Sequence, residues 1–440
     1  MVRSPTDSAK YRGLRWSYFA EAANSLFVGF TIFGSHFILF LDSLGISKAG
    51  IGVLLSLLPL MGLSALVSAP MIGRLGYKRT FLYFYGARKL VMASLLCTPL
   101  VLSGIGKFGG FLFVASVVAI FGLCRAIAET ALLPWSMEYI PDEVRGRFSA
   151  VSGILSTLIG LLASIISGGV LYKFTGITPY MLLIITGVFF GLVSVTFYSH
   201  IPGGEPLNAP HKIHGAYHNM AFAISNRNFR YFLVGYGLML TALSPTVVLL
   251  PLFYRTQIGL TLSQTVWTQA PMLAGSICTT YLWGKSSDRY GGKTVMQSGL
   301  VLFCLLPLGW MSLPRYSVAS IYYVFAIEAL RGIVVSAWGI GSAHYLFVSV
   351  IPKAKKELFT TVFYASTGLS SGISLILSGW VIDHTPNLSS TLLFLKIDLY
   401  APLFIFMMVA PMICYLLFKQ VVVDSASDYP QERIRGYGVL

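Results

Sequence analysis

The sequence predicts an all-α membrane protein, and three observations support that fold class: its composition, its apolar stretches and the placement of its basic residues. Of its 440 residues, 55% are hydrophobic and only 11% are charged, and the mean hydropathy is +0.74. A soluble protein of this composition lacks the polar side chains to cover its surface, so much of that surface must face lipid.

The apolar stretches have the length of membrane-spanning helices, which need about 20 residues at 1.5 Å per residue. Twelve such spans are predicted, at residues 16–41, 49–72, 81–104, 109–133, 149–172, 178–200, 229–254, 262–284, 295–313, 317–350, 359–382 and 391–418. The longest polar stretch follows the sixth span and divides the chain into two six-helix halves. The predicted parts are therefore a tail (1–15), an N-terminal half (16–200), a central loop (201–228), a C-terminal half (229–418) and a second tail (419–440).

The basic residues predict the orientation of these spans. Most of the 31 Lys and Arg residues lie in the two tails and in the loops that share their side of the membrane. The loops of the other side hold only Lys48, Lys107, Lys173, Arg255 and Arg315. Because positive residues favour the cytoplasmic side, both termini and the central loop are predicted to be cytoplasmic, in a plasma or inner membrane. The net charge of +15 is thus explained without a nucleic-acid partner.

Residues typical of cofactor or metal sites are sparse. The five cysteines lie singly within apolar stretches, with no spacing that suggests a disulfide framework or a zinc site. His211, His214 and His218 are loosely spaced in the central loop, where a solvated segment is the preferred interpretation. No Walker A loop is present, so ATP is not expected to drive the protein directly. We therefore expect no cofactor and no metal, and a monomer in the lipid bilayer.

Two patterns recur in equivalent loops of the two halves. The segment Gly73-Arg74-Leu75-Gly76-Tyr77-Lys78 follows the second span, and Asp288-Arg289-Tyr290-Gly291-Gly292-Lys293 follows the eighth span 215 positions later. A second offset, of 211, relates the approaches to the fifth and eleventh spans: Ile140-Pro141, Arg145 and Phe148 correspond to Ile351-Pro352, Lys356 and Phe359. Two ordered matches in corresponding loops predict an internal duplication.

These loops resemble those of the major facilitator superfamily, in which a Gly-x-x-x-Asp-Arg-x-Gly-x-Lys pattern joins the second and third helices. The second copy here carries the whole pattern, at Gly284, Asp288, Arg289, Gly291 and Lys293. The first copy keeps Arg74, Gly76 and Lys78 but has Gly73 in place of the Asp. The resemblance implies the major facilitator fold, two six-helix halves with inverted repeats, and a secondary transporter that works by alternating access.

The resemblance also implies that these loop residues, together with Arg145 in the Arg-Gly segment after the fourth span, take part in gating at the cytoplasmic face. A simpler interpretation stays open beside it. Basic residues at this face anchor helix ends and set orientation, and glycines permit tight turns.

Charged residues within the apolar spans are the strongest site candidates, because each costs at least about 2.5–3.5 kcal/mol at mid-bilayer unless it faces a cavity or a partner. Arg125 and Glu129 lie four residues apart in the fourth span and are expected to share a helix face. Glu21 in the first span is expected at a similar depth. The three residues are predicted to form a cluster in which two carboxylates share one guanidinium.

Such a cluster predicts proton coupling, because two nearby carboxylates beside one Arg do not both ionise cheaply. It resembles proton-coupled antiporters of the superfamily, which pair an acidic residue of the first helix with the Arg of the fourth. Their Gly-Pro signature in the fifth helix is absent, since Ser167-Gly168-Gly169 lacks the proline. The alternative is a permanent salt bridge that ties the two helices together.

Other charged residues in the spans receive different interpretations. Glu328 and Arg331 form a similar pair in the tenth span, either a solute contact or gate or a pair satisfied within its own helix. Arg88 and Lys89 are placed close enough to the cytoplasm to extend their side chains to it. Lys396 and Asp398 are placed near the outer interface at the start of the twelfth span. Further residues are candidates for lining a cavity: Asn24, Phe27, Tyr236, Tyr323 and Trp338.

The favoured function is proton-coupled export of an amphipathic compound, with the proton gradient as energy source and small solute and protons as the partners. Uptake of a small polar solute, by symport or facilitation, is the alternative within the same class. A receptor or an enzyme on the same fold is the alternative of another class. An enzyme is not expected, because Asp383 and His384 are the only neighbouring acid–base pair outside the core of a span, and adjacent helical residues point apart.

Overall fold

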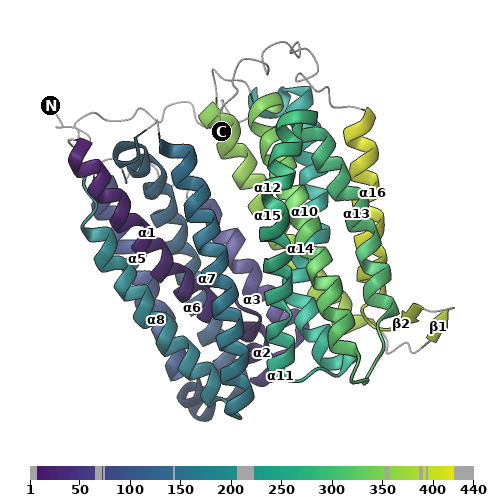
Figure 1. The fold of residues 1–440 in the computed structure, drawn as a ribbon. Coiled ribbons are helices and arrows are strands. Elements are labelled where there is room, and N and C mark those ends of the chain that lie inside the picture. The colour runs from purple at the N-terminus through teal and green to yellow at the C-terminus, as the bar shows by residue number, and fades with distance from the viewer. Residues whose placement is uncertain are drawn as a thin grey trace.

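The computed structural model describes residues 7–64, 72, 75–141, 144–205, 222–351, 356–385, 390–392 and 395–420. Its helices form two bundles that lie side by side, one from the first half of the chain and one from the second (Figure 1). We call the end of the molecule at which α1 (Asp7–Phe30) begins and α16 (Ala401–Gln420) ends the tail end, and the opposite end the far end.

The N-terminal half is built from helices that alternate in direction between these two ends. After α1 they are, in chain order, α2 (Ser35–Ser43), α3 (Lys48–Met61), the 3-10 turn η1 (Gly62–Ser64), α5 (Tyr77–Ala93), the 3-10 turn η2 (Ser94–Cys97), α6 (Thr98–Tyr139), α7 (Arg145–Lys173) and α8 (Thr178–Ser199). The first span is broken between α1 and α2. The long α6 is interrupted at Gly106, whose φ of 77° and ψ of −175° are not helical. The 63-residue helical stretch Tyr77–Tyr139 thus holds both the third and the fourth predicted spans.

The C-terminal half repeats this arrangement. Its elements are α10 (Arg227–Phe253), the π-helical segment η4 (Tyr254–Ile258), α11 (Leu262–Trp267), α12 (Gln269–Tyr290), α13 (Gly292–Ser312), α14 (Ser320–Tyr345), the π-helical segment η5 (Leu346–Val350), α15 (Lys356–His384), strands β1 (Ser390–Leu392) and β2 (Leu395–Ile397), and finally α16. The two strands form a short antiparallel hairpin at the far end (Figure 1).

Every predicted span contains a helix, and the fold class is confirmed. Among the described residues, nine helical stretches are long and apolar enough to cross a membrane, and Lys48–Ser64 is a shorter apolar one. Several boundaries differ, among them the helix starts at Asp7 and Tyr77, which precede the predicted starts at 16 and 81. The twelfth span begins at Ala401 rather than at residue 391, because residues 390–392 and 395–397 form the two strands. The fourth continues to Tyr139 and the eighth to Tyr290, each about two turns beyond its predicted end.

The duplicated loop patterns adopt the same backbone in both halves. Gly76 precedes α5 with φ 87° and ψ 141°, and Gly291 precedes α13 with φ 87° and ψ 148°. Side-chain-bearing residues rarely adopt a φ of this sign, so both positions require glycine for the turn. The match supports the internal duplication at the level of individual torsion angles.

The two halves contact one another toward the far end. The backbone amide of Ala49 at the start of α3 donates to Asp383 Oδ2 of α15 at 2.8 Å. A Cβ on Gly52 of α3 would lie 2.4 Å from the carbonyl oxygen of Leu375, so these helices touch through their backbones. On the other side of the bundle, Trp267 Nε1 of α11 donates to the carbonyl of Ile165 in α7 at 3.1 Å.

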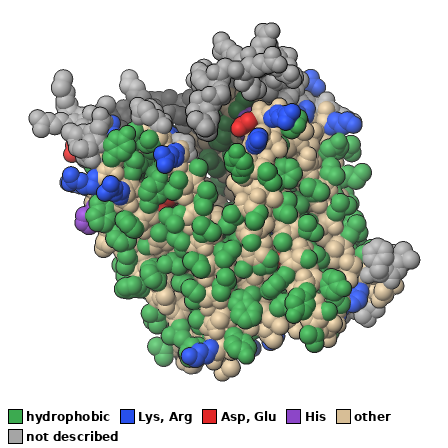
Figure 2. Space-filling model, in the orientation of Figure 1, with side chains coloured by type: hydrophobic (Ala, Val, Ile, Leu, Met, Phe, Trp, Pro, Cys, Tyr) green, Lys and Arg blue, Asp and Glu red, His purple; other side chains and the backbone are tan. Residues whose placement is uncertain are grey.

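Toward the tail end the halves separate. The space-filling view shows a hollow between them at that end, and a continuous, largely hydrophobic surface over the remainder of this face (Figure 2). We call this hollow the recess. A molecule closed at one end and open at the other presents its interior to one side of the membrane only.

Candidate functional site

Helices α1, α5 and α6 bring six polar residues together inside the N-terminal half. We call them the N-half cluster: Glu21, Asn24, Arg88, Lys89, Arg125 and Glu129. Counted at 1.5 Å per residue from the tail-end termini of their helices, Arg88 and Glu129 lie about 15–17 Å deep, and Glu21 and Arg125 about 21 Å deep. The cluster therefore lies near the middle of the spans.

Glu129 bridges two guanidinium groups. Arg125 Nε donates to Glu129 Oε1 at 2.7 Å, and Arg88 Nη1 lies 3.8 Å from the same oxygen. The side chain of Glu129 is 51% exposed and that of Arg125 is 33% exposed. Since a carboxylate at this depth is not stable against lipid, the exposed face of the pair belongs to the recess. The expected pairing of two carboxylates with one Arg is replaced by one carboxylate between two Arg.

Asn24 supplies the other polar contact to the buried cations. Its Oδ1 accepts from Lys89 Nζ at 2.7 Å and from Arg88 Nη2 at 3.2 Å. The remaining contacts of Lys89 are with aromatic faces, since Nζ lies 3.5 Å from the ring centre of Phe27 and 4.2 Å from that of Tyr85. The ring of Tyr85 also lies 4.2 Å from the guanidinium of Arg88. Aromatic faces stabilise a desolvated cation by about 2 kcal/mol, without neutralising it.

The burial of Arg88 and Lys89 corrects the prediction that their side chains extend to the cytoplasm. They are only 5% and 0% exposed. The helix begins at Tyr77, four residues before the predicted start of the span at residue 81, so both side chains begin about three turns inside it. With the helix start placed correctly, the sequence would have shown two adjacent cations deep in an apolar helix, which is a signal for a functional site.

Glu21 lies within the cluster but makes no ion pair among the described residues. Its Oε2 is buried without a hydrogen-bond partner there. Ser152 of α7 lies beside it, and the tyrosines at positions 85, 139 and 198 are within electrostatic range. The predicted ion pair between Glu21 and Arg125 is therefore absent from this conformation.

Phe33 gives the cluster an aromatic face at the break between α1 and α2. The guanidinium of Arg125 lies 4.9 Å from its ring centre, and the side chain is partly exposed. This residue was not among the sequence candidates. Phe27, which was, is instead fully buried and packs on Phe121 and Lys89. Phe33 is thus a partly exposed aromatic residue in contact with the cluster.

The corresponding charged pair of the C-terminal half is sealed inside its bundle. Glu328 and Arg331 of α14 are 0% and 8% exposed. Arg331 Nε donates to Glu328 Oε2 at 2.9 Å, and the hydroxyl of Tyr254 donates to Glu328 Oε1 at 2.6 Å. Both carboxylate oxygens are satisfied, one by Arg331 of the same helix and the other by Tyr254 of η4, so the pair is satisfied by two elements rather than within its own helix alone.

The remaining cavity candidates of this half differ in their exposure, and Tyr236 is only partly buried. Trp338 is 2% exposed and packs on Tyr236, with ring centres 5.4 Å apart, in an aromatic core that includes Phe232 and Phe363. Tyr323 is more than half exposed in the first turn of α14 at the far end. Burial therefore removes Trp338 as a cavity-lining residue, and the place of Tyr323 at the far end separates it from the recess, while Tyr236 stays a prediction.

The residues expected in gating loops lie mainly in helices. Gly284, Asp288 and Arg289 belong to the last turns of α12, and Asp288 lies 3.8 Å from His344 Nε2 at the end of α14. Lys293 lies in the first turn of α13. Gly73 and Arg74 are outside the described residues.

Two further motif residues bind backbone carbonyls at helix ends. Arg145 Nη2 donates to the carbonyl of Ile140, 3.3 Å away at the end of α6, and Lys78 Nζ donates to that of Ile201 at 2.6 Å. These contacts agree with the simpler role of anchoring helix ends.

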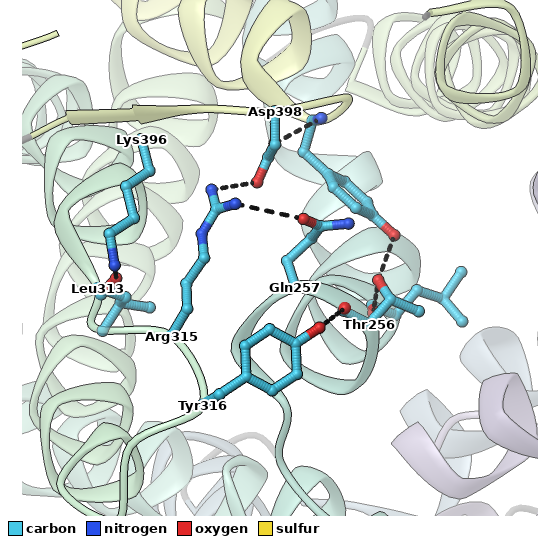
Figure 3. Close-up of polar contacts among 9 residues, drawn as sticks. Thr256, Gln257, Leu313, Arg315, Tyr316, Lys396 and Asp398 are labelled. Carbon is cyan, nitrogen blue, oxygen red and sulfur yellow. Dashed lines mark hydrogen bonds and ion pairs between the residues drawn. The ribbon is translucent and has the colours of Figure 1, made fainter. Parts of the chain in front are cut away.

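Lys396 and Asp398 lie outside the helix to which they were assigned. They belong to the hairpin segment at the far end, where Arg315 Nη2 donates to Asp398 Oδ2 at 2.7 Å and Lys396 Nζ donates to the carbonyl of Leu313 at 3.2 Å (Figure 3). Asp398 Oδ1 also accepts the amide of Tyr400, at the start of α16. Burial raises the pKa of Asp398 above its usual value although Arg315 and the Tyr400 amide oppose the shift. This network fastens the hairpin to the turn before α14.

A cavity of about 520 Å³ lies at the same end, lined by Gly259, Gln264, Tyr316 and Tyr322 among others. It is remote from the N-half cluster and contains no charged side chain, so it is not the site of the chemistry described above. Within the described part of the chain, no group of three or more His, Cys, Asp and Glu residues is placed to hold a metal ion.

Comparisons with known proteins agree with this geometry. The family profile described as Major Facilitator Superfamily matches residues 22–340 and again residues 232–435. No curated protein matches the sequence.

Solved structures match over nearly the whole chain. A variant of the nucleoside transporter NupG has a TM-score of 0.71 at 13% identity, covering 93% of this chain and 99% of its own. A bacterial homologue of the human lysosomal transporter Spinster, inward-facing and unoccupied, has a TM-score of 0.66 at 11% identity over 95% and 98% of the two chains. A bacterial homologue of the iron transporter ferroportin, also inward-facing, has a TM-score of 0.64 at 13% identity over 94% and 98%. At these identities the likeness establishes the fold alone.

Proposed function

The chain belongs to the Major Facilitator Superfamily and is a multi-pass membrane transporter of small solutes rather than an enzyme. We propose that protons drive the transport through Glu129, and that Glu21 is the second candidate for carrying a proton. The observation that supports the proposal is the position of Glu129. It is a half-exposed carboxylate at mid-span, held by Arg125 at 2.7 Å with Arg88 at 3.8 Å.

Glu129 has the access that a coupling residue needs. Its exposed face meets the recess, so water can deliver or remove a proton while the molecule is open at the tail end. Protonation would cancel its attraction to Arg125 and Arg88 and release both cations for another partner. Glu21 lies on the adjacent α1 with one buried oxygen unbonded. An unpaired buried carboxylate is costly, and a proton on Glu21 would remove that cost.

Alternating access fits the arrangement of the two halves. If the positive-inside bias places the tail end in the cytoplasm, the recess is open to the cytoplasm and the far end is closed. Rocking of the two halves about the N-half cluster would close the recess and open the far end. The contact from Ala49 to Asp383 and that from Trp267 to Ile165 would then have to break.

Two modes of proton coupling are candidates. Export of an amphipathic compound in exchange for protons, the mode favoured by the sequence, requires solute and proton to compete for a carboxylate, and Glu129 beside Arg125 provides one. Cotransport of a small polar solute with protons is favoured by a different observation. The cluster contains three basic side chains and two acidic ones, so protonation of Glu129 leaves cations for the solute to neutralise.

Proton flux in proteoliposomes tests the proposal. The purified protein is reconstituted with a pH-sensitive dye inside the vesicles, and a panel of anionic, neutral and cationic organic solutes is added outside. Solute-dependent proton movement is expected in the wild type and is expected to be lost in Glu129→Gln. Movement of protons with the solute indicates cotransport, and movement against it indicates exchange.

Glu138→Gln is the matched control. Glu138 lies on the same helix nine residues later, where its Oε2 accepts the amide of Gly204 at 2.6 Å. A Gln oxygen can still accept that bond, so proton flux should remain close to wild type. Unchanged solute-driven proton flux in both Glu129→Gln and Glu21→Gln would refute proton coupling at this cluster.

A further inference from the structure

The N-half cluster has an excess of positive charge that its own residues do not neutralise. Arg88, Lys89 and Arg125 face only two carboxylates, Glu21 and Glu129. Within the described part of the chain no carboxylate lies within ion-pair distance of Lys89, and Arg88 Nε is buried without a hydrogen-bond partner. Buried cations are normally paired or neutral, so this cluster is incomplete as it stands.

Glu129 marks the place at which a further anion can reach these cations. Its carboxylate contacts Arg125 and Arg88 from the recess side, and its side chain is half exposed. A carboxylate or phosphate arriving through the recess would meet the same two guanidinium groups. Arg groups bind such anions through two parallel hydrogen bonds. Glu129 is thus the internal competitor of an incoming anion.

The face of the site next to Arg125 is apolar. The ring of Phe33 lies against the guanidinium and is partly exposed. A solute whose charged group binds Arg125 would therefore place its adjoining atoms on an aromatic surface. The site combines a charge-binding end with an apolar wall.

We propose that the solute is an amphipathic organic anion, carrying a carboxylate or a phosphate, which displaces Glu129 from Arg125 and Arg88 while Glu129 takes up a proton from the recess. The anion and the proton are then bound together, so the transported unit is an anion with a proton. This inference rests on the proposed role of Glu129 and names the solute class of that same site. It favours cotransport over exchange.

The groups around Glu129 set the pH dependence of this displacement. Arg125 lies on its own helix, Arg88, Lys89 and Tyr85 on α5, and Glu21 on α1. Tyr139 of α6 and Tyr198 of α8 lie around Glu21. At higher pH the Glu129 carboxylate competes more strongly with the anion. Since anion binding is coupled to uptake of a proton, anion affinity should fall as pH rises.

Binding to the purified protein in detergent tests the inference without any gradient. Phenylphosphate and benzoate serve as the anionic probes, benzamide as the neutral one and benzylammonium as the cationic one, each followed by thermal stabilisation and calorimetry. Both anions are expected to bind in the millimolar range, and the neutral and cationic probes to bind at least about tenfold more weakly. Binding of phenylphosphate alone would assign the site to phosphates, and binding of benzoate alone to carboxylates.

Two variants with opposite expected effects separate a binding role from a structural one. Arg125→Gln should weaken anion binding about tenfold, because it removes a charge-assisted pair. Glu129→Gln should strengthen binding about tenfold at neutral pH and abolish its pH dependence and proton uptake. Arg147→Gln, an exposed cation at the start of α7, is the control and should bind as the wild type does.

The inference fails if neither anion binds, if benzamide or benzylammonium binds as tightly as the anions, or if Arg125→Gln binds both anions normally. The proposed proton coupling can be judged separately. If anions bind as expected but proton flux survives in Glu129→Gln and Glu21→Gln, the anion site stands and the coupling residue lies elsewhere. If proton flux is lost in Glu129→Gln but no anion binds, the coupling stands and the solute class is wrong.

Discussion

The two halves of the molecule each place an Arg–Glu pair on equivalent helices, and the structure treats the two pairs differently. In the N-terminal half, Arg125 and Glu129 open onto the recess, with two more cations behind them. In the C-terminal half, Glu328 and Arg331 are enclosed, and Tyr254 occupies the remaining carboxylate oxygen. The internal duplication thus supplied two similar pairs of which one is complete and the other is not.

The difference indicates that one charged pair stabilises the fold while the other is available to bind a solute or a proton. A fully satisfied buried pair has nothing left to bind, and removing one partner exposes the other to a low dielectric. An unsatisfied, water-accessible cluster contributes little to stability, yet it can exchange partners. We therefore expect substitutions in the C-terminal pair to affect folding and substitutions in the N-half cluster to affect binding.

The largest expected effect follows from Glu328→Gln. The substitution leaves Arg331 charged and enclosed without its carboxylate, which should destabilise the protein by about 3–5 kcal/mol. Loss of yield and a lowered unfolding midpoint in detergent are the measurements. Glu129→Gln is the matched comparison and should change stability by less than about 1 kcal/mol, because Arg125 stays in contact with water.

A second change shows whether the Glu328 result comes from the stranded charge. The double variant Glu328→Gln with Arg331→Met removes both charges, and it should recover much of the lost stability. If the double variant is as unstable as Glu328→Gln alone, the pair matters through packing, and the contrast between the halves is not electrostatic.

Tyr254→Phe should have the next largest effect on stability. It removes the hydroxyl that donates to Glu328 Oε1 at 2.6 Å and leaves a buried carboxylate oxygen unsatisfied. A hydrogen bond to a charged group contributes about 1.5–3 kcal/mol. Equilibrium unfolding in mixed detergent micelles measures the loss. An unchanged midpoint would mean that Glu328 is held by Arg331 alone.

Lys89→Met tests the same comparison in the N-half cluster, where a buried charge lacks an ionic partner among the described residues. Lys89 is as fully buried as Glu328, but its polar contact is with the amide of Asn24. Replacing an unneutralised buried cation by an apolar side chain should leave stability unchanged or raise it. Phenylphosphate affinity should fall about threefold to tenfold, since a positive charge behind Arg125 is lost. A large loss of stability would show that Lys89 is structural.

The presence of the helices could be predicted from hydropathy, because a bilayer constrains the length and the composition of every membrane-spanning segment. Strands β1 and β2 were not predicted, because hydropathy does not distinguish a short apolar strand from part of a helix. The break at Gly106 depends on a single backbone torsion within an apolar stretch, which no window of hydropathy resolves. Boundaries were therefore less predictable than the presence of each span.

The site was predictable only where its contacts are local. The spacing of Arg125 and Glu129 places both on one face of a single helix, and they lie there. The contacts of Glu129 with Arg88 and of Asn24 with Lys89 join different helices. Hydropathy does not predict how those helices are rotated about their axes. An error of about one turn in a helix start was enough to move Arg88 and Lys89 from the centre to the surface.

The smallest expected effect comes from Phe33→Leu, which removes the aromatic wall from the N-half cluster. The ring centre lies 4.9 Å from the guanidinium of Arg125, so the ring of a bound phenylphosphate would lie against Phe33, and the loss of that contact should cost an amount near the lower end of about 0.5–1.5 kcal/mol. Phenylphosphate affinity should therefore fall about twofold to fivefold, while Arg125 keeps its bond to Glu129. Tyr290→Leu is the control, because Tyr290 makes a similar contact with Arg289 at 5.1 Å at the end of α12, away from Arg125. Equal losses in both variants would show that the contact acts through general stability, and would remove the apolar wall from the description of the site.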